Sequence, residues 1–464
     1  MEINKILAEE FKLRQEQVVN TVALIDDGKT IPFIARYRKE LTGSLDDQIL
    51  RELSDRLTYL RNLEIRKSEV SSSIAEQGKL TEEISSALDK AETLVEVEDI
   101  YRPFKPKRKT RASIAREKGL EVLADLIGRQ DDKLDLHNEA QKFINVENGL
   151  ETEEEVIQGA SDIIAENVSD DAELRKSIRK LYEKAAKIES RASDENAETV
   201  YQNYYEFCEP VSKIADHRIL ALDRGEKEGA LKVSVSIDEE FCFSIAERKY
   251  VINNTDSGNI VKAAVQDSCK RLIMPSVERE IRAELTARAA EGAIKVFSSN
   301  LRQLLLQPPI KNSVTLGLDP AYRTGCKIAV VDSIGKVLDT TVIYPTPPQK
   351  KIEEAKTKLK KLITKYGVTT IAIGNGTASR ESEEFVAELI KEIPQNVSYM
   401  VVSEAGASVY SASKLAAEEF PEYDVSLRSA VSIARRLQDP LAELVKIDPK
   451  AIGVGQYQHD MPKA

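Results

Sequence analysis

Apolar residues recur at helical spacing through the first ninety positions of the chain. The first stripe comprises Leu13, Val18, Val22 and Ile25. Gly28 follows this stripe, where a left-handed residue would end the helix. A longer seam comprises Leu50, Leu53, Leu57, Leu60 and Leu63. We predict that Ser44 is the N-cap of this second helix and that a further helix begins near Thr81. The pattern therefore predicts a long helical hairpin.

The middle of the chain, up to about residue 312, also reads as mostly helical. The run 171–191 is rich in Lys and Arg and predicts one long helix. Strict alternation at 231–237 predicts a strand, and 241–245 is its expected antiparallel partner. The Pro308-Pro309 pair marks a boundary at which the pattern changes.

After this boundary, strand-like and helix-like segments alternate. The expected strands are 314–318, 327–331, 337–343, 370–373 and 398–402. The expected helices are 348–366, 379–392, 407–417 and 426–445. Three meander strands followed by crossover helices predict a mixed sheet in the order of ribonuclease H-like folds. We therefore expect a multidomain, mainly α protein, with a helical region at 1–312 and an α/β domain at 313–455.

Composition describes a charged, helix-rich chain. The 464 residues are 41% hydrophobic and 31% charged, with a net charge of −11. No apolar run is long enough for a membrane span, so we expect no membrane partner. The N-terminus lacks the apolar core of a signal peptide, and four cysteines without CxxC spacing favour a reducing cytoplasm. The global charge disfavours nucleic acid, but a local concentration of positive charge would outweigh it.

Positive charge is concentrated in a loop at 101–111. Its basic residues are Arg102, Lys105, Lys107, Arg108, Lys109 and Arg111. Pro103 and Pro106 favour an extended loop, and Tyr101 and Phe104 are candidates for stacking on bases. The alternative is a solvated loop that packs on the acidic helix before it.

A second, smaller candidate for phosphate contact lies near the N-terminus. Arg36 and Arg38 flank Tyr37 in a short helix that begins with Ile31-Pro32. The alternative is a charged surface turn in which Phe33 and Tyr37 belong to the core.

Several long motifs resemble the Tex family of bacterial transcription accessory proteins. They are IPFIARYRKELTGSLDD, EDIYRPFKPKRKTRASIAREKGLE, LGLDPAYRTGCKIAVVD, IAIGNGTASRE, SEAGASVYSAS and RSAVSIARRLQDPLAELVKIDPKAIGVGQYQHD. The resemblance implies a helical N-terminal region with a helix-turn-helix-like part, followed by a YqgF-type ribonuclease H-like domain. It also implies nucleic-acid binding and a role in transcription. Family members continue into helix-hairpin-helix modules and an OB-fold RNA-binding domain. On this basis 456–464 is the expected start of a linker to such modules.

Three acidic residues look like the acidic positions of YqgF-type domains: Asp319, Glu404 and Asp439. Converging carboxylates could hold Mg²⁺ for two-metal cleavage of a phosphodiester. Each acid also has a structural interpretation: Asp319 as a turn cap, Glu404 as an acid at a helix N-terminus, and Asp439 as the partner of Arg435. The glycine-rich turn at 374–377 could receive a phosphate at the helix that follows it.

Three functions are consistent with these patterns. We favour a non-enzymatic scaffold that binds RNA or DNA, requires no cofactor and acts in transcription. One alternative is a Mg²⁺-dependent nuclease built on Asp319, Glu404 and Asp439. The other is a protein-interaction platform for RNA polymerase or ribosome-associated proteins.

Overall fold

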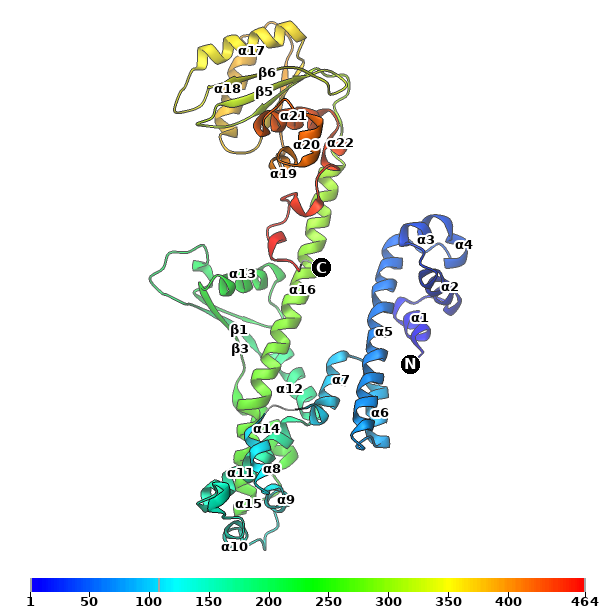
Figure 1. Cartoon of the computed structure of the whole chain (residues 1–464), viewed down its shortest axis with the longest axis vertical. Helices are drawn as coiled ribbons and strands as arrows, with labels where there is room; N and C mark the ends of the chain where they lie inside the picture. Colours follow the sequence, from blue (N-terminus) through cyan, green and yellow to red (C-terminus); the bar gives the residue numbers. More distant parts are fainter. Residues whose placement is uncertain (1, 107–108, 463–464) are drawn as a thin grey trace. The chain divides into compact units, whose positions relative to one another are not determined.

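The computed structural model describes residues 2–106 and 109–462, which form two compact units. The first unit comprises Met1–Ile214 and Gly229–Glu284, and the second comprises Ala215–Glu228 and Leu285–Ala464. The chain is mainly α-helical with two separate sheets, which confirms the predicted fold class (Figure 1). None of the helices in the described part of the chain is long and apolar enough to cross a membrane.

In the first unit the N-terminal helices gather along one long helix, α5 (Figure 1). The helices here are α1 (Ile3–Phe11), α2 (Gln15–Asp26), α3 (Ile31–Tyr37), α4 (Lys39–Thr42), α5 (Asp47–Glu76), α6 (Glu82–Lys90) and α7 (Leu94–Tyr101). The predicted leucine seam of α5 is buried and packs on α1 and α2. The hairpin exists, but α6 is much shorter than α5.

The predicted N-cap of α5 was wrong. Asp46, not Ser44, accepts a hydrogen bond from the backbone N–H of Ile49, at 2.8 Å. Ser44 instead has a φ of +63°, in the turn that follows Gly43. Both residues are good N-caps by type, so the sequence alone did not distinguish them.

The rest of the first unit is a helical body with a three-stranded antiparallel sheet in the order β2-β1-β3. Its helices are α8 (Arg111–Glu117), α9 (Glu121–Gly128), α10 (Leu136–Gln141), α11 (Glu153–Ser169), α12 (Ala172–Ala185), α14 (Glu239–Tyr250), α15 (Asp256–Asp267) and the start of α16 (Met274–Leu305). Its strands are β1 (Lys187–Ala192), β2 (Glu206–Pro210) and β3 (Leu231–Ser236).

Two sequence predictions in this body were wrong. The helix expected over 171–191 ends at Ala185, and its last residues form β1, whose side chains alternate between buried and exposed. The predicted strand at 241–245 lies in α14, which Asp238 caps through its side chain. The strand β3 was predicted, and β1 is its partner. The helix-turn-helix part that the family resemblance implies stays a prediction.

A π-helix at Ser268–Ile273 joins α15 to α16. Pro275, at the second position of α16, has no N–H to donate. The helical register changes just before this proline, which allows the run to continue through it.

The second unit is built around a five-stranded mixed sheet in the order β6-β5-β4-β7-β8. The strands are β4 (Thr315–Asp319), β5 (Cys326–Val331), β6 (Val337–Ile343), β7 (Thr370–Gly374) and β8 (Ser398–Val402). β4, β5 and β6 form an antiparallel meander, whereas β7 and β8 run parallel to β4. All five strands and their mixed order match the sequence prediction.

Helices cover both faces of this sheet (Figure 1). They are α17 (Ile352–Tyr366), α18 (Ser379–Lys391), α19 (Ala407–Ser411), α20 (Lys414–Glu419), α21 (Val425–Gln438) and α22 (Pro440–Leu444), and the unit also holds α13 (Asp216–Lys227). α17 and α18 pack on one face, and α21 packs on the other. The helix predicted over 426–445 is interrupted at Asp439, where Pro440 starts α22.

The segment from about residue 454 is held against α13 and the end of α16. Arg224 of α13 donates a hydrogen bond to the carbonyl of Gln456 at 3.0 Å, and its guanidinium lies 4.6 Å from the ring centre of Tyr457. Asn300 of α16 donates to the carbonyl of Val454 at 2.9 Å. Gln456 and Tyr457, at the beginning of the segment that we predicted as the start of a linker, therefore contact α13.

Candidate functional site

Asp319 and Glu404 meet at one edge of the five-stranded sheet. Asp319 is the last residue of β4, and Glu404 comes two residues after β8. Because β4, β7 and β8 are parallel, their carboxyl ends lie at the same edge. Burial and, after it, the negative charge of Asp319 raise the pKa of Glu404. The parallel strands therefore bring Asp319 and Glu404 to the same edge of the sheet.

A glycine-rich turn makes room for Glu404. A Cβ added at Gly374 or at Gly376 would collide with the Glu404 carboxylate, so a larger residue at either position would force the Glu404 side chain to move. Between them, Asn375 accepts a hydrogen bond from the backbone N–H of Glu404 at 2.8 Å. The glycines of the IAIGNGT motif therefore serve a close approach between the β7–α18 turn and Glu404.

Burial makes both carboxylates harder to ionise. Burial raises the pKa of Asp319, and a hydrogen bond from Ser429 together with the charge of Lys327 oppose this effect. Burial, followed by the charge of Asp319, raises the pKa of Glu404, and the Gly376 N–H and the charge of Arg436 lower it. Perturbed carboxyl groups that lie close together are typical of functional sites, although structural networks produce them too.

Arg436 is a residue of this site that the sequence reasoning missed. It projects from α21, and only 3% of its surface is exposed. Its Nη1 donates hydrogen bonds of 2.8 Å to the carbonyls of Ser403 and Ala405, the residues on either side of Glu404. Its Nε and Nη2 are buried and have no hydrogen-bond partner among the residues that the structure describes. Burial lowers the pKa of this guanidinium, and the charges of Glu443 and Glu404 oppose that effect.

The structure does not bring Asp439 to the other two acids. Asp439 follows α21 and caps α22 through a 3.1 Å hydrogen bond from the N–H of Ala442. Its neighbour Gln438 donates hydrogen bonds of 2.7 Å to the carbonyls of Ser313 and Asp332. Ser313 precedes β4, whereas Asp319 ends it, so Asp439 lies near the opposite edge of the sheet.

The described residues therefore do not assemble the predicted three-carboxylate magnesium centre. Among them, no group of three or more His, Cys, Asp and Glu side chains is arranged to hold a metal ion. Asp319 and Glu404 alone supply fewer protein ligands than two-metal phosphodiester cleavage uses. Mg²⁺ stays a prediction from sequence, and no catalytic step is derived through it.

The basic loop is largely engaged with the protein itself. Residues Arg102–Phe104 form a 3₁₀ turn rather than an extended segment. Arg102 lies 3.4 Å from Asp170, and Lys105 forms an ion pair with Glu98. Tyr101 and Phe104 pack against the hydrophobic cluster that α5, α6 and α7 form together. These contacts match the alternative that the loop packs on the acidic helix before it.

The remaining basic residues of this loop are more open. Lys109 and Arg111 are exposed, and Arg111 begins α8 within electrostatic reach of Asp162. Lys107 and Arg108 lie outside the described residues.

A cationic surface with an exposed aromatic ring lies on α3 and α4, which we call the α3–α4 surface: Arg36, Tyr37, Arg38 and Lys39. Tyr37 is 57% exposed, although its ring lies 5.3 Å from that of the half-buried Phe33. Arg38 stacks on Phe33, with 5.3 Å between the guanidinium carbon and the ring centre. Arg36 and Lys39 are exposed, and among the described residues neither has an ion-pair partner. The alternative in which Tyr37 belongs to the core is therefore wrong for this residue.

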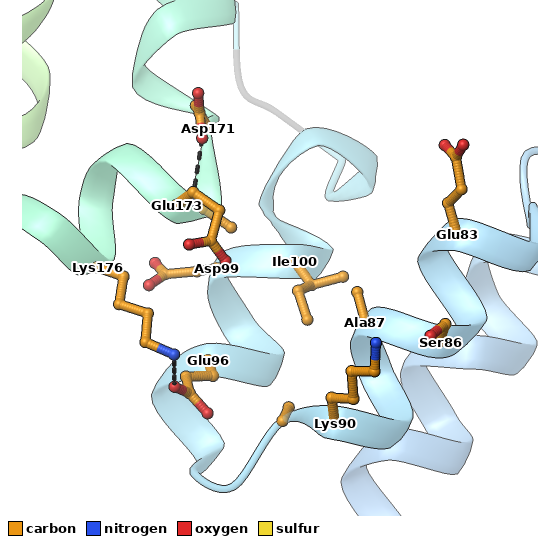
Figure 2. A pocket seen from close by; sticks show the side chains of 12 residues that line it. Glu83, Ser86, Ala87, Lys90, Glu96, Asp99, Ile100, Asp171, Glu173 and Lys176 are labelled. Atoms are coloured by element: carbon orange, nitrogen blue, oxygen red, sulfur yellow. Dashed lines mark hydrogen bonds and ion pairs between the residues drawn. The ribbon is translucent and has the colours of Figure 1, made fainter. Parts of the chain in front are cut away.

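A hollow of about 400 Å³ lies elsewhere in the first unit, among α6, α7 and the start of α12 (Figure 2). Its acidic lining is mostly neutralised. Glu96 pairs with Lys176 at 2.7 Å, and Asp171 pairs with Lys249. Asp99 pairs with two buried arginines. Glu83, Lys90 and Glu173 also line the hollow and form no ion pair among the described residues, so the hollow keeps some unpaired charge.

Together, the helical first unit and the mixed sheet with its carboxylates define a multidomain protein that carries a YqgF-type ribonuclease H-like domain. Comparison with family models agrees and is more specific. Residues 1–75 match the Tex-like protein N-terminal domain, 131–297 match the Tex central region, and 313–438 match the Tex protein YqgF-like domain. The chain belongs to the Tex family.

Relatives match along almost the whole chain. YdcI of Bacillus subtilis, an uncharacterized protein, is 51% identical over 98% of this chain and 64% of its own length. The transcriptional accessory protein Tex of Neisseria gonorrhoeae is 44% identical over 99% of this chain and 61% of its own length. The human S1 RNA-binding domain-containing protein 1 is 38% identical over 98% of this chain and 47% of its own length. The chain thus spans less than two thirds of the length of these relatives.

Proposed function

We propose that this chain is a nucleic-acid-binding scaffold that acts in transcription, and that the α3–α4 surface contacts the nucleic acid. The observation that carries the proposal is the exposed ring of Tyr37 beside Arg36 and Lys39, two cations without an ion-pair partner among the described residues. Clustered cations gain binding energy by releasing counterions from phosphates, whatever the total charge of the protein.

The exposed ring adds a second type of contact. A base can stack on an exposed tyrosine, and such stacking is tolerant of sequence. The pairing of stacking with phosphate contacts favours single strands, whose bases are accessible, over duplexes. The relatives' printed names, which refer to transcription and to RNA binding, support the same class of function.

The loop at 101–111 makes a smaller contribution in this proposal. Arg102 and Lys105 already have carboxylate partners, so a phosphate would have to compete with Asp170 and Glu98. Lys109 and Arg111 remain exposed and can extend the contact. Lys107 and Arg108 are predicted to do so from sequence.

The test is fluorescence anisotropy of this chain with labelled single-stranded RNA and duplex DNA across a salt series. The Arg36→Ala/Lys39→Ala variant is expected to bind single-stranded RNA more weakly. Its slope of log K against log salt should be shallower by about 1.4, from about 0.7 per phosphate contact. Tyr37→Ala should lose about 1–3 kcal/mol with an unchanged salt slope, since stacking releases no counterions.

The matched control is Lys180→Ala/Lys184→Ala, which removes two exposed cations from α12. An equal loss in the control would mean that only net charge matters. Unchanged binding in both α3–α4 variants would contradict the proposal. Failure of the wild-type chain to bind any nucleic acid would favour the protein-interaction platform instead.

A further inference from the structure

The position that the Glu404 carboxylate occupies, at the glycine-rich turn before α18, has the features of an anion-binding site. We call this position the seat of Glu404. α18 has 13 residues, and no side chain caps its N-terminus, because Ala378 occupies the N-cap position with a φ of +64°. The Glu404 carboxylate lies against Gly374 and Gly376 in the turn just before α18, and the backbone of Gly376 lowers its pKa against the effect of burial. Glycines at 374 and 376 leave the backbone open to close approach. Uncapped helix N-termini and glycine-rich turns bind anions through backbone N–H groups.

The Glu404 carboxylate is incompletely hydrogen-bonded in this seat. Its Oε1 is buried and has no hydrogen-bond partner in the described part of the chain. A buried carboxylate oxygen without a donor costs free energy.

Arg436 supplies a second, independent sign that an anion belongs here. Its guanidinium is anchored through Nη1 to the carbonyls on either side of Glu404, yet Nε and Nη2 have no partner. A guanidinium with two neighbouring N–H groups to spare matches the oxygens of a phosphate. No hydrogen bond joins Arg436 to Glu404 among the described contacts, so the internal carboxylate does not use these donors.

We propose that the glycine-rich turn before α18, together with Arg436, is a phosphate-binding site that Glu404 closes when no ligand is present. A phosphate group displaces the Glu404 carboxylate, accepts the Gly376 N–H and takes the free N–H groups of Arg436. Glu404 then turns to solvent from the half-buried 403–406 turn on which it stands. The proposal does not rest on nucleic-acid binding by the α3–α4 surface, which is separate in sequence and contains other residues.

The test is isothermal titration of the chain with inorganic phosphate at neutral pH. Glu404→Ala vacates the seat and is expected to bind phosphate at least tenfold more tightly than the wild type does. Glu404→Gln, which keeps the shape without the charge, should gain less. Adding Arg436→Met to Glu404→Ala should abolish the gain. Circular dichroism checks that each variant is folded.

The matched control is Glu384→Ala, which removes one carboxylate from the exposed side of the same helix. An equal increase in phosphate affinity in this control would mean that the change in net charge alone explains the effect, and it would overturn the proposal. Equal phosphate affinity in wild type and Glu404→Ala would overturn it as well.

A measurement on the wild type removes the dependence on variants. In hydrogen exchange, saturating phosphate is expected to protect amides at 375–379 and to expose those at 403–406, relative to chloride at equal ionic strength. No change in either segment would contradict the displacement of Glu404.

Oligonucleotides then identify the source of the phosphate. Tighter binding of a 5′-phosphorylated strand than of the unphosphorylated strand by Glu404→Ala would assign the site to a terminal phosphate. An equal gain for both strands would assign it to the backbone, and a gain for inorganic phosphate alone would assign it to a small anion. Combining Glu404→Ala with Arg36→Ala/Lys39→Ala should leave the gain for inorganic phosphate intact, which separates this site from the α3–α4 surface.

Discussion

The Nε of Arg175 lies 2.6 Å from Oδ1 of Asp99, and both side chains are almost fully buried. The other oxygen of Asp99 lies 2.7 Å from Nη2 of Arg179, and Glu280 pairs with both arginines. Asp99 stands on α7, the arginines on α12 and Glu280 on α16. This network therefore joins the helix that ends the N-terminal hairpin to two helices of the helical body.

Asp99→Ala is expected to destabilise the first unit by about 3–5 kcal/mol, because it leaves two buried guanidinium groups to share one remaining carboxylate. Hydrogen exchange of amides in α7, α12 and α16 measures the local free energy of opening. We expect the protection of all three helices to fall together, since the network is common to them.

The control is Glu384→Ala, which breaks an i, i+4 pair with Arg380 whose side chains are 69% and 89% exposed. Exposed pairs contribute about 0.2–1 kcal/mol, so this change should have little effect. Similar losses in the two variants would mean that burial of the Asp99 network does not determine its contribution.

Gly374→Ala is expected to destabilise the turn between β7 and α18 by about 1–3 kcal/mol, the usual range for overpacking. The added methyl collides with the Glu404 carboxylate. In a double-mutant cycle, Glu404→Ala should remove most of this cost, because the atoms in collision are gone. Urea unfolding followed by circular dichroism provides the four free energies.

Gly453→Ala is the matched control, since a Cβ at Gly453 meets no atom within 4 Å. The loss of unfolding free energy in Gly453→Ala should be small, and it should be the same whether or not Glu404 is replaced by alanine. An additive cycle for Gly374→Ala and Glu404→Ala would contradict the described seat of Glu404.

The sequence predicted the five-stranded sheet well because each strand carries its own local signal. Buried strands such as β4 and β7 are short apolar runs bounded by turn residues. By contrast, Lys187–Ala192 continues the charged pattern of α12, and it becomes a strand through pairing with β2 and β3, which come later in the sequence. The aromatic run at 241–245 has strand propensity, but the Asp238 cap and helical packing override it.

The candidate site was predicted in part for the same reason. Asp319 and Glu404 follow parallel strands, and the carboxyl ends of parallel strands share an edge. Asp439 and Arg436 stand on or just after α21, whose path across the sheet no local pattern reveals. Arg102 and Lys105 also find their carboxylate partners through tertiary packing. The composition of the loop therefore suggested that these basic residues are more available to a ligand than they are in the structure.

Asp46→Ala is expected to cost about 1 kcal/mol of helix stability, the typical loss of an N-cap. Asp46 accepts the Ile49 N–H at the start of α5, whereas Ser44 makes no such contact. Ser44→Ala should therefore leave the stability of α5 nearly unchanged. Hydrogen exchange at the first turn of α5 distinguishes the two, and a larger loss in Ser44→Ala would contradict the assigned cap.

Asp319→Asn is expected to stabilise the second unit at neutral pH. Burial raises the pKa of Asp319 above its ordinary value of 3.8, so the folded state holds this proton more tightly than the unfolded state does. The stabilisation from protonation is complete below pH 3.8 and is lost as the pH rises through the raised pKa. The wild type therefore bears the cost of the buried charge at pH 7, and asparagine removes it while keeping an acceptor for Ser429.

Asp339→Asn provides a control of opposite sign in the same unit. Hydrogen bonds from Tyr366 and Lys365 lower the pKa of Asp339, so its stabilisation is present above 3.8 and is lost as the pH falls through the lowered pKa. The free energy of unfolding of both variants and the wild type is measured from below pH 3.8, where Asp339 loses its contribution, up to pH 8, by hydrogen exchange of peptides from β4 to β6. As the pH rises, the free energy of unfolding of Asp319→Asn should increase relative to that of the wild type. That of Asp339→Asn should decrease relative to the wild type. If the stability of Asp319→Asn relative to the wild type did not rise with pH, or if both variants changed with pH in the same direction, Asp319 would not be destabilised by its buried charge.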